Sequence, residues 1–265
     1  MNLELRGKHA IVTGGSRGIG LATARALAGE GCAVALVARG ERALKEAASA
    51  IEKDGGRAIA LAGDARDDAQ VRAVVERAAA ELGGVDILVN AAATPGGGGT
   101  PPTLEALRDD DVRQEVETKV LGYLRFARAA APYMVRQRWG RIVSISGLAA
   151  RQASSIAGSM RNVAVAAMTK NLADELGPHG VNVTVVHPGM TETERTPGMV
   201  AALMERSGIT GDEARSRLAA SISIGRLVTA AEIADVICFL CSARSVAING
   251  DAIAVGGGIK GPIYY

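Results

Sequence analysis

The chain has 265 residues, of which 48% are hydrophobic, so it can bury a large core as a single domain of ordinary size. Its 30 lysine and arginine residues nearly balance 28 aspartate and glutamate residues, and a net charge of +2 gives no broad field for nucleic acid or anionic lipid. No apolar run approaches the roughly 20 residues of a membrane helix, and residues 1–8 do not resemble a secretory signal, so we expect a cytoplasmic protein.

Short apolar and β-branched runs alternate with longer alanine-rich stretches of helical period along most of the chain. Parallel strands need crossover connections that are right-handed and usually helical, so this alternation predicts an α/β fold, a doubly wound parallel sheet with helices on both faces. We expect helices over residues 17–29, 41–54, 67–82, 104–137 and 153–176. Seven strands are expected, over residues 9–15, 33–39, 58–64, 85–93, 141–147, 181–189 and 252–256.

Two segments break this alternation, and each follows a predicted strand, where an open parallel sheet places its ligand crevice. Residues 94–102 read TPGGGGTPP, and their four glycines and three prolines predict a loop. Residues 190–220 separate the sixth strand from the next helix, and their apolar residues at 199–204 favour a short helix. We expect this second segment either to cover a substrate or to be a plain surface insertion.

A glycine-rich turn lies between the first predicted strand and the first predicted helix. Glycine permits close approach of the backbone to a pyrophosphate, and the free N–H groups and dipole of a helix N-terminus favour negative charge. Because a strand precedes the turn and a helix follows it, the motif predicts a dinucleotide site rather than a purely structural turn. Its residues are Thr13, Gly14, Gly15, Ser16, Arg17, Gly18, Ile19 and Gly20.

The end of the second predicted strand helps to distinguish NAD from NADP. NAD sites usually place an acidic residue there to bind the ribose hydroxyls, whereas this chain has Ala38, Arg39 and Gly40. Arg39 and Arg17 offer two guanidinium groups whose donors suit a 2′-phosphate. We therefore predict NADP(H) as the cofactor; the alternative is that both arginines simply face water.

The chain has three cysteines, Cys32, Cys238 and Cys241. The last two form a C-x-x-C pattern, but they lie in an apolar helical stretch without histidines at ligand spacing. We interpret all three as buried free thiols and predict no metal site.

The spacing Thr-Gly-x-x-x-Gly-x-Gly at residues 13–20 resembles the short-chain dehydrogenase/reductase family, and the likeness runs nearly end to end. Asn90-Ala91-Ala92-Ala93 is similar to the family's Asn-Asn-Ala-Gly strand end, and His187-Pro188-Gly189 is similar to its Pro-Gly loop beside the nicotinamide. The resemblance implies a Rossmann-type fold, a small-molecule substrate and a homo-oligomer, a dimer or a tetramer. It implies cofactor contacts from Gly14, Ser16, Arg17, Gly18, Ile19, Gly20, Arg39, Asp64, Ala65, Asn90, Ala91, Pro188, Gly189 and Thr193.

The family's catalytic residues are a tyrosine, a lysine four residues later, a serine and an asparagine, and this chain departs from the pattern at each. Alignment places Gly158 at the tyrosine position, Asn162 at the lysine position, Gly147 at the serine position and Lys119 at the asparagine position. The absence of the catalytic tyrosine does not depend on the alignment, because the chain contains no Tyr-x-x-x-Lys. A reductase mechanism here needs another proton donor.

Several residues are candidates for that donor. Ser146 and Ser159 flank the vacated positions, and Lys119 could act as an acid if burial lowered its pKa. His187 is of the type that titrates near neutrality. Arg161 could stabilise an oxyanion, and Tyr264 and Tyr265 could reach a neighbouring subunit; Lys170 is expected on a solvated helix face.

Three functions therefore stay open. The first is an NADP(H)-dependent oxidoreductase acting on a small carbonyl or activated alkene with an atypical proton donor. The second is a non-redox lyase, isomerase or cyclase that reuses the same pocket. The third is a catalytically inactive NADP-binding partner subunit. A retained nucleotide site is expected in all three, and fold alone cannot separate them.

Overall fold

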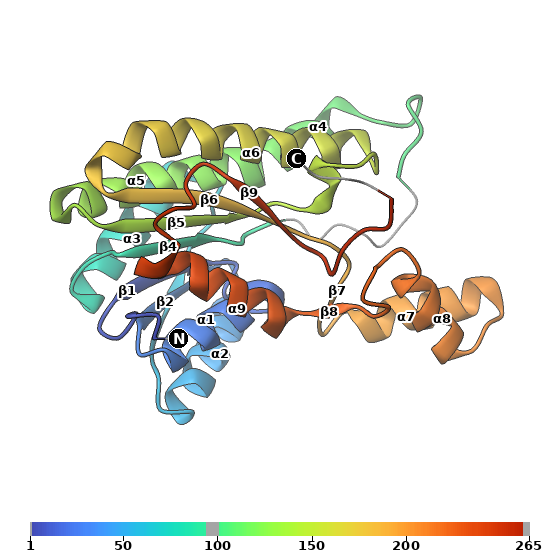
Figure 1. Cartoon of the computed structure of the whole chain (residues 1–265), viewed down its shortest axis with the longest axis horizontal. Helices are drawn as coiled ribbons and strands as arrows, with labels where there is room; N and C mark the ends of the chain where they lie inside the picture. The colour runs from blue at the N-terminus through green and yellow to red at the C-terminus, as the bar shows by residue number, and fades with distance from the viewer. Residues whose placement is uncertain (1, 94–100, 262–265) are drawn as a thin grey trace.

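A seven-stranded parallel sheet runs through the computed structural model, which describes residues 2–93 and 101–261 (Figure 1). Its strands are β1 (His9–Thr13), β2 (Ala33–Ala38), β3 (Arg57–Ala62), β4 (Ile87–Asn90), β5 (Gly140–Ile145), β6 (Val181–Pro188) and β9 (Ala252–Val255). They pair in the order β3-β2-β1-β4-β5-β6-β9, so the strand order reverses between β1 and β4. The predicted doubly wound α/β fold is confirmed, and sheets of this kind bind ligands outside the strand ends at that reversal.

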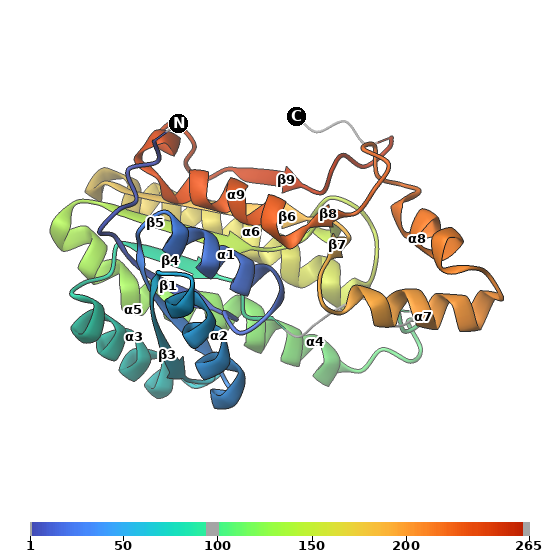
Figure 2. The same ribbon diagram turned by 90° about the horizontal axis from the view of Figure 1, so that it is seen from below.

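Helices cover both faces of the sheet. One face carries α1 (Gly18–Gly29), α2 (Glu41–Lys53) and α9 (Ala230–Cys241); the other carries α3 (Asp68–Leu82), α5 (Gly122–Gln137) and α6 (Ile156–Leu176). Figure 2 shows α1 and α9 lying side by side. The central strands are thus buried on both sides, which explains why their sequences are continuous apolar runs rather than alternating ones.

Side-chain caps explain where several helices begin. The carboxylate of Asp67 accepts hydrogen bonds from two backbone N–H groups in the first turn of α3, and the hydroxyl of Ser155 accepts one in the first turn of α6. Thr229 and Glu232 form a reciprocal capping box at the start of α9. Short 3₁₀ turns occur at Leu148–Ala150, Gly177–His179 and Ala243–Ser245.

The long helix expected over residues 104–137 begins later and is not uniform. It consists of α4 (Asp109–Glu115), a π-helical turn η1 (Val116–Leu121) and α5. Three aspartates at the start of α4 suit the positive end of the helix dipole. The π-helical turn is the unexpected part, and such turns occur frequently at functional sites.

The segment after β6 contains more structure than the one short helix expected for it. Two helices, α7 (Thr196–Ser207) and α8 (Gly211–Ala219), lie between β7 (Thr191–Glu192) and β8 (Val228–Thr229). These two-residue strands pair in parallel, and α7 and α8 extend beyond the carboxyl ends of the large sheet (Figure 1). A capping box of Thr210 and Glu213 begins α8.

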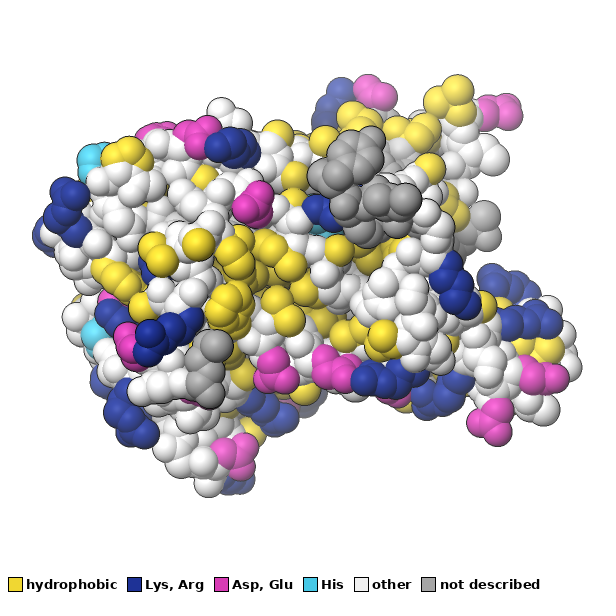
Figure 3. Space-filling model, in the orientation of Figure 1, with side chains coloured by type: hydrophobic (Ala, Val, Ile, Leu, Met, Phe, Trp, Pro, Cys, Tyr) yellow, Lys and Arg dark blue, Asp and Glu magenta, His cyan; other side chains and the backbone are white. Residues whose placement is uncertain are grey.

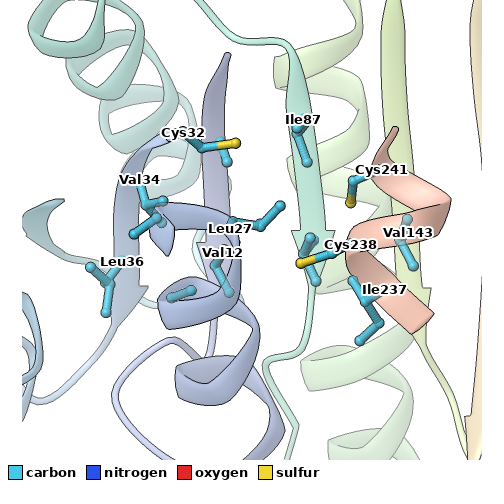
Figure 4. Close-up of a cluster of buried hydrophobic side chains, with 14 of the residues drawn as sticks. Val12, Leu27, Cys32, Val34, Leu36, Ile87, Val143, Ile237, Cys238 and Cys241 are labelled. Carbon is cyan, nitrogen blue, oxygen red and sulfur yellow. The ribbon is translucent and has the colours of Figure 1, made fainter. Parts of the chain in front are cut away.

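The core beneath α1 and α9 contains the three cysteines. Cys32, Cys238 and Cys241 are buried free thiols among aliphatic side chains such as Leu27 and Ile237 (Figure 4). Burial raises the pKa of Cys32 and of Cys238 to about 12. The cysteines therefore act as small core residues.

The surface carries side chains of both charge signs, as expected from the net charge of +2. Figure 3 shows hydrophobic side chains gathered in the middle of one face, near α9 and β9, with both signs of charge around them. Within the described residues, no helix is both long and apolar enough to cross a bilayer.

Candidate active site

One crevice of about 1500 Å³ opens at the carboxyl ends of the strands, beside the reversal between β1 and β4. Every residue predicted to contact the cofactor lines this crevice except Asn90. Because parallel strands end at the same edge of the sheet, residues far apart in the sequence meet here. They are Gly14, Ser16, Arg17, Gly18, Ile19, Gly20, Arg39, Asp64, Ala65, Ala91, Pro188, Gly189 and Thr193.

The glycine-rich turn forms a cradle that larger residues would fill. A Cβ atom on Gly14 would lie 2.8 Å from the carbonyl oxygen of Ala91, and one on Gly20 would overlap the carbonyl oxygen of Gly14. Gly18 has φ +56°, which favours glycine. This close backbone packing at the start of α1 fits a dinucleotide pyrophosphate.

Three arginines surround the crevice near the ends of β1, β2 and β3. Arg17 and Arg39 are exposed, and neither side chain forms a hydrogen bond or salt bridge within the described part of the chain. Arg66 instead donates hydrogen bonds to Asp64, which is the main reason why the pKa of Asp64 lies below its usual range; Arg39 also lowers it through its charge. The first two guanidinium groups are therefore available to an anionic ligand.

Asn90 lies behind the crevice wall rather than in it. It is fully buried at the end of β4, where its amide donates to the carbonyl of Tyr123 at 3.5 Å. The next two residues face the crevice, and the backbone N–H groups of Ala91 and Ala92 donate to the hydroxyl of Thr13 at 3.0 and 3.1 Å. Thr13 thus holds the ends of β1 and β4 together below the nucleotide site.

The positions aligned with the family's serine, tyrosine and lysine line the same crevice. Gly147 leaves room for Asn162, because a Cβ atom at residue 147 would lie 2.9 Å from the Asn162 amide nitrogen. Gly158 lies in the first turn of α6, where its N–H donates to the capping hydroxyl of Ser155 at 3.1 Å. Because residues 158 and 162 are glycine and asparagine, α6 contributes neither a tyrosine phenol nor a lysine ammonium to the floor of the crevice.

Lys119 reaches this floor from the opposite helix. It lies on the π-helical turn η1, is only 3% exposed, and lines the crevice. Its Nζ donates to the carbonyl oxygen of Ser146 at 2.7 Å and to Oδ1 of Asn162 at 3.1 Å. Burial, assisted by the charge of Arg161 and opposed by Glu115, lowers the pKa of Lys119 to about 7. Near neutral pH, the amine can therefore exchange a proton.

The two serine candidates lie in different surroundings. Ser146 lines the crevice, but its hydroxyl donates to the backbone carbonyl of Asn162 at 3.0 Å. Ser159 does not line the crevice but an adjoining hollow that shares part of its wall at residues 149–156, and its buried hydroxyl has no hydrogen-bond partner within residues 2–93 and 101–261. The structure therefore does not bring Ser159 together with Lys119 and the nucleotide loop.

His187 lies on β6 beneath the crevice wall and is 1% exposed. Its Nδ1 accepts a hydrogen bond from the N–H of Gly147 at 3.4 Å, an arrangement that leaves the ring proton on Nε2. Burial, followed by the charges of Arg151 and Lys119, lowers the pKa of His187 to about 4. The ring is neutral near pH 7, so we do not retain His187 as the acid.

The sequence also raises Lys170, Tyr264 and Tyr265. Lys170 is exposed and pairs with Asp174 at 2.5 Å, as expected for a solvated helix face. Tyr264, Tyr265 and most of the glycine-rich loop at 94–102 lie outside the described residues, although Pro102 lines the crevice.

Comparison with known proteins agrees with this geometry. Residues 8–203 match the short chain dehydrogenase family. The chain belongs to this family. Among its relatives, the short-chain reductase protein NovJ of Streptomyces niveus is 37% identical over 250 residues, which cover 94% of this chain and 92% of NovJ. The 3-oxoacyl-acyl-carrier-protein reductase FabG of Escherichia coli is 33% identical over 264 residues, which cover 98% of this chain and 99% of FabG.

Solved structures of other family members share the whole fold of this short-chain dehydrogenase. L-Sorbose reductase from Gluconobacter frateurii, complexed with NADPH and L-sorbose, is 31% identical with a TM-score of 0.91, and the match covers 99% of this chain and all of that one. A variant of actinorhodin polyketide ketoreductase, solved with NADPH, is 31% identical with a TM-score of 0.86, covering 95% and 96% of the two chains. Both neighbours therefore contain the cofactor that the sequence predicts.

Two acidic residues of this short-chain dehydrogenase were not singled out from the sequence. Glu115 pairs with Arg161 across the crevice, and Glu194 accepts a hydrogen bond from the N–H of Gly18 at 3.2 Å. The position of Glu115 four residues before Lys119 is the one sequence signal, because it puts both on one helix face. Nothing in the sequence around Glu194 indicates its contact with the nucleotide loop.

Proposed function

We propose that this short-chain dehydrogenase is an NADP(H)-dependent reductase of a small carbonyl compound or activated alkene, with Lys119 as its proton donor. The observation that carries the proposal is the buried Nζ of Lys119 at the crevice floor, bonded to Ser146 and Asn162. The atypical donor takes the place of the tyrosine that is absent between Tyr133 and Tyr264.

The nucleotide half of the crevice supports NADP(H). The glycine cradle at the start of α1 suits a pyrophosphate, and the exposed Arg17 and Arg39 suit a 2′-phosphate. When bound, NADPH supplies the hydride that adds to the electrophilic carbon of the substrate. The NADPH complexes of two structural neighbours favour the same cofactor here.

Lys119 supplies the proton that this reduction also requires. As an ammonium, Lys119 has three N–H donors, and Ser146 and Asn162 accept two of them. The third is left for the substrate oxygen: as the C=O double bond becomes single, the oxygen takes the electron pair and then the proton from Nζ. A donor whose pKa lies at about 7 can both give up and regain that proton near neutral pH.

The segment containing α7 and α8 is the proposed cover for the substrate. Met190 and Met199 from this segment line the crevice, and α7 extends beyond the carboxyl ends of the sheet. Apolar side chains at that point would exclude water from the reacting groups.

Deuterium-labelled NADPH and a panel of small ketones and activated alkenes test the proposal. Deuterium should appear in the product, and Lys119→Met should reduce turnover by about 10²-fold or more while leaving NADPH binding intact. Lys170→Met is the matched control, since it removes an exposed lysine and should change neither.

Three outcomes would contradict the proposal. Full turnover in Lys119→Met excludes this donor. Product formed without NADPH oxidation indicates a non-redox enzyme. NADPH binding without turnover of any compound in the panel indicates a nucleotide-binding partner subunit.

A further inference from the structure

Lys119 belongs to a four-residue arrangement that joins two helices. Glu115 and Lys119 lie one turn apart on α4 and η1, and Arg161 and Asn162 are neighbours on α6. The Nη1 of Arg161 pairs with Oε2 of Glu115, and the Nζ of Lys119 donates a hydrogen bond to Oδ1 of Asn162 at 3.1 Å. The Glu115–Arg161 ion pair and the Lys119–Asn162 hydrogen bond both join the two helices. Together they hold one negative and one positive charge beside the amine of Lys119.

The ion pair is partly shielded from water, so its charges act on their neighbour more strongly than surface charges would. The side chain of Arg161 is 12% exposed and that of Glu115 is 23% exposed, and both line the crevice with Lys119. Charge interactions at this depth are screened less than at the surface. The Nε of Arg161 is buried without a hydrogen-bond partner within the described residues, so the Nη1 contact with Glu115 is the ion pair that holds this guanidinium in place.

Two other ionisable groups near Lys119 are neutral near pH 7, and Arg151 acts on His187 rather than on Lys119. His187 on β6 is neutral near pH 7, and burial raises the pKa of Tyr123 on α5 so that its phenol stays neutral. The guanidinium of Arg151, near His187, donates to the backbone carbonyl of Ala252. Glu115 and Arg161 are thus the charges that act on Lys119 in addition to its burial.

We propose that the Glu115–Arg161 ion pair controls the proton on Lys119, with the carboxylate strengthening and the guanidinium weakening the hold of the amine on that proton. This inference rests on the proposed role of Lys119 as proton donor. Glu115 and Arg161 are then positioning residues, because they act on the reaction through Lys119.

Two substitutions break the same ion pair from opposite ends and separate an electrostatic role from a structural one. Glu115→Gln removes the negative charge and should lower the pKa of Lys119, whereas Arg161→Met removes the positive charge and should raise it, each by roughly half a unit to one unit. Loss of a merely structural link would move the pKa in the same direction in both variants, or not at all. Arg161→Lys keeps the charge and should restore the original value.

The readout is the NMR titration of lysine side chains in the full-length protein with isotopically labelled lysine, in which Lys119 is assigned by its loss in Lys119→Met. Glu117→Gln is the matched control, because Glu117 lies on the same π-helical turn but pairs with Arg125 at 2.7 Å. It should leave the titration of Lys119 unchanged. NADPH binding and circular dichroism verify that each variant is folded.

The outcomes distinguish failure of the inference from failure of the proposed function. If Lys119 does not titrate between about pH 6 and 8, the proposed donor itself is wrong. If Lys119 titrates there but Glu115→Gln and Arg161→Met move it in the same direction, or leave it in place, only the role of the ion pair is overturned. Opposite shifts support the inference, and the pH profile of turnover should then shift in the same two directions.

Discussion

A carboxylate oxygen of Glu194 lies 3.2 Å from the backbone nitrogen of Gly18 and accepts its hydrogen bond. Glu194 comes from the connection between β7 and α7, and Gly18 is the first residue of α1 in the glycine-rich turn. The side chain therefore takes an N–H group at the helix end that attracts anions. A pyrophosphate arriving there would meet a negative charge already in place.

The first prediction concerns this contact. Glu194→Gln should bind NADPH roughly two- to tenfold more tightly than the unmodified chain, because a like charge next to the pyrophosphate is removed. Calorimetric titration measures the change. Glu192→Gln is the control, since Glu192 pairs with Arg215 at 3.0 Å and should not alter the affinity. Weaker binding in Glu194→Gln would show that the carboxylate assists the nucleotide instead.

The second prediction concerns the choice between NADPH and NADH. Arg39→Asp should weaken NADPH binding by about tenfold or more and abolish or reverse the preference for NADPH, because a donor to the 2′-phosphate becomes a repelling charge. Arg42→Gln is the control, because Arg42 is exposed on α2 and pairs only weakly with Glu46. Equal affinities for the two nucleotides in the unmodified chain would contradict the NADP(H) assignment.

The third prediction concerns stability at low pH. The pKa of folded His187 is about 4, below its ordinary value of 6.5, so the unfolded state binds more protons between these values. His187 therefore lowers the free energy of unfolding as the pH falls through this window, by up to about 3 kcal/mol at pH 4 relative to neutral pH.

Urea unfolding at several pH values measures this effect. In His187→Gln, the decrease in stability between about pH 6.5 and 4 should be smaller than in the unmodified chain. The exposed His179 provides the control, since His179→Gln should leave the pH dependence unchanged. An unchanged slope in His187→Gln would mean that His187 ionises freely in the folded state.

The fourth prediction concerns the thiols. Cys32, Cys238 and Cys241 are buried and their pKa values are raised by burial, so none should react with a thiol reagent such as Ellman's at mildly alkaline pH in the folded protein. All three should react in denaturant. Fast labelling of one thiol in the native state would contradict the core packing around α9.

The sequence was sufficient for the sheet, and it also predicted most of the residues that gather at the crevice, because both depend on local patterns. Strands buried on both faces are continuous apolar runs, and residues that follow parallel strands meet at one edge. Arg39 could be placed at the crevice for that reason alone. Asn90 shows the limit, since one position along β4 decides whether a side chain faces the ligand or the interior.

The rest of the site depends on contacts between distant segments. The pairing of Glu115 with Arg161 joins residues 46 positions apart, and the π-helical turn under Lys119 has no signature in the sequence. The sequence indicates His187 through the ordinary pKa of histidine, and burial changes that pKa by an amount that only the fold reveals. The alignment points to Lys119, but it does not indicate that the Lys119 ammonium donates hydrogen bonds to the carbonyl of Ser146 and to the side chain of Asn162.

The strands β7 and β8 pair Thr191 with Val228 and Glu192 with Thr229, so they hold the two ends of the α7–α8 segment side by side. Any replacement for residues 193–227 would start and end at these same anchor points. Each doubling of its length would add only about 0.6 kcal/mol to the cost of closing the loop. A change in the length of the α7 and α8 helices should therefore cost little in loop closure, provided that Glu194 and the backbone hydrogen bonds that join residues 221–224 to residues 257–260 are kept.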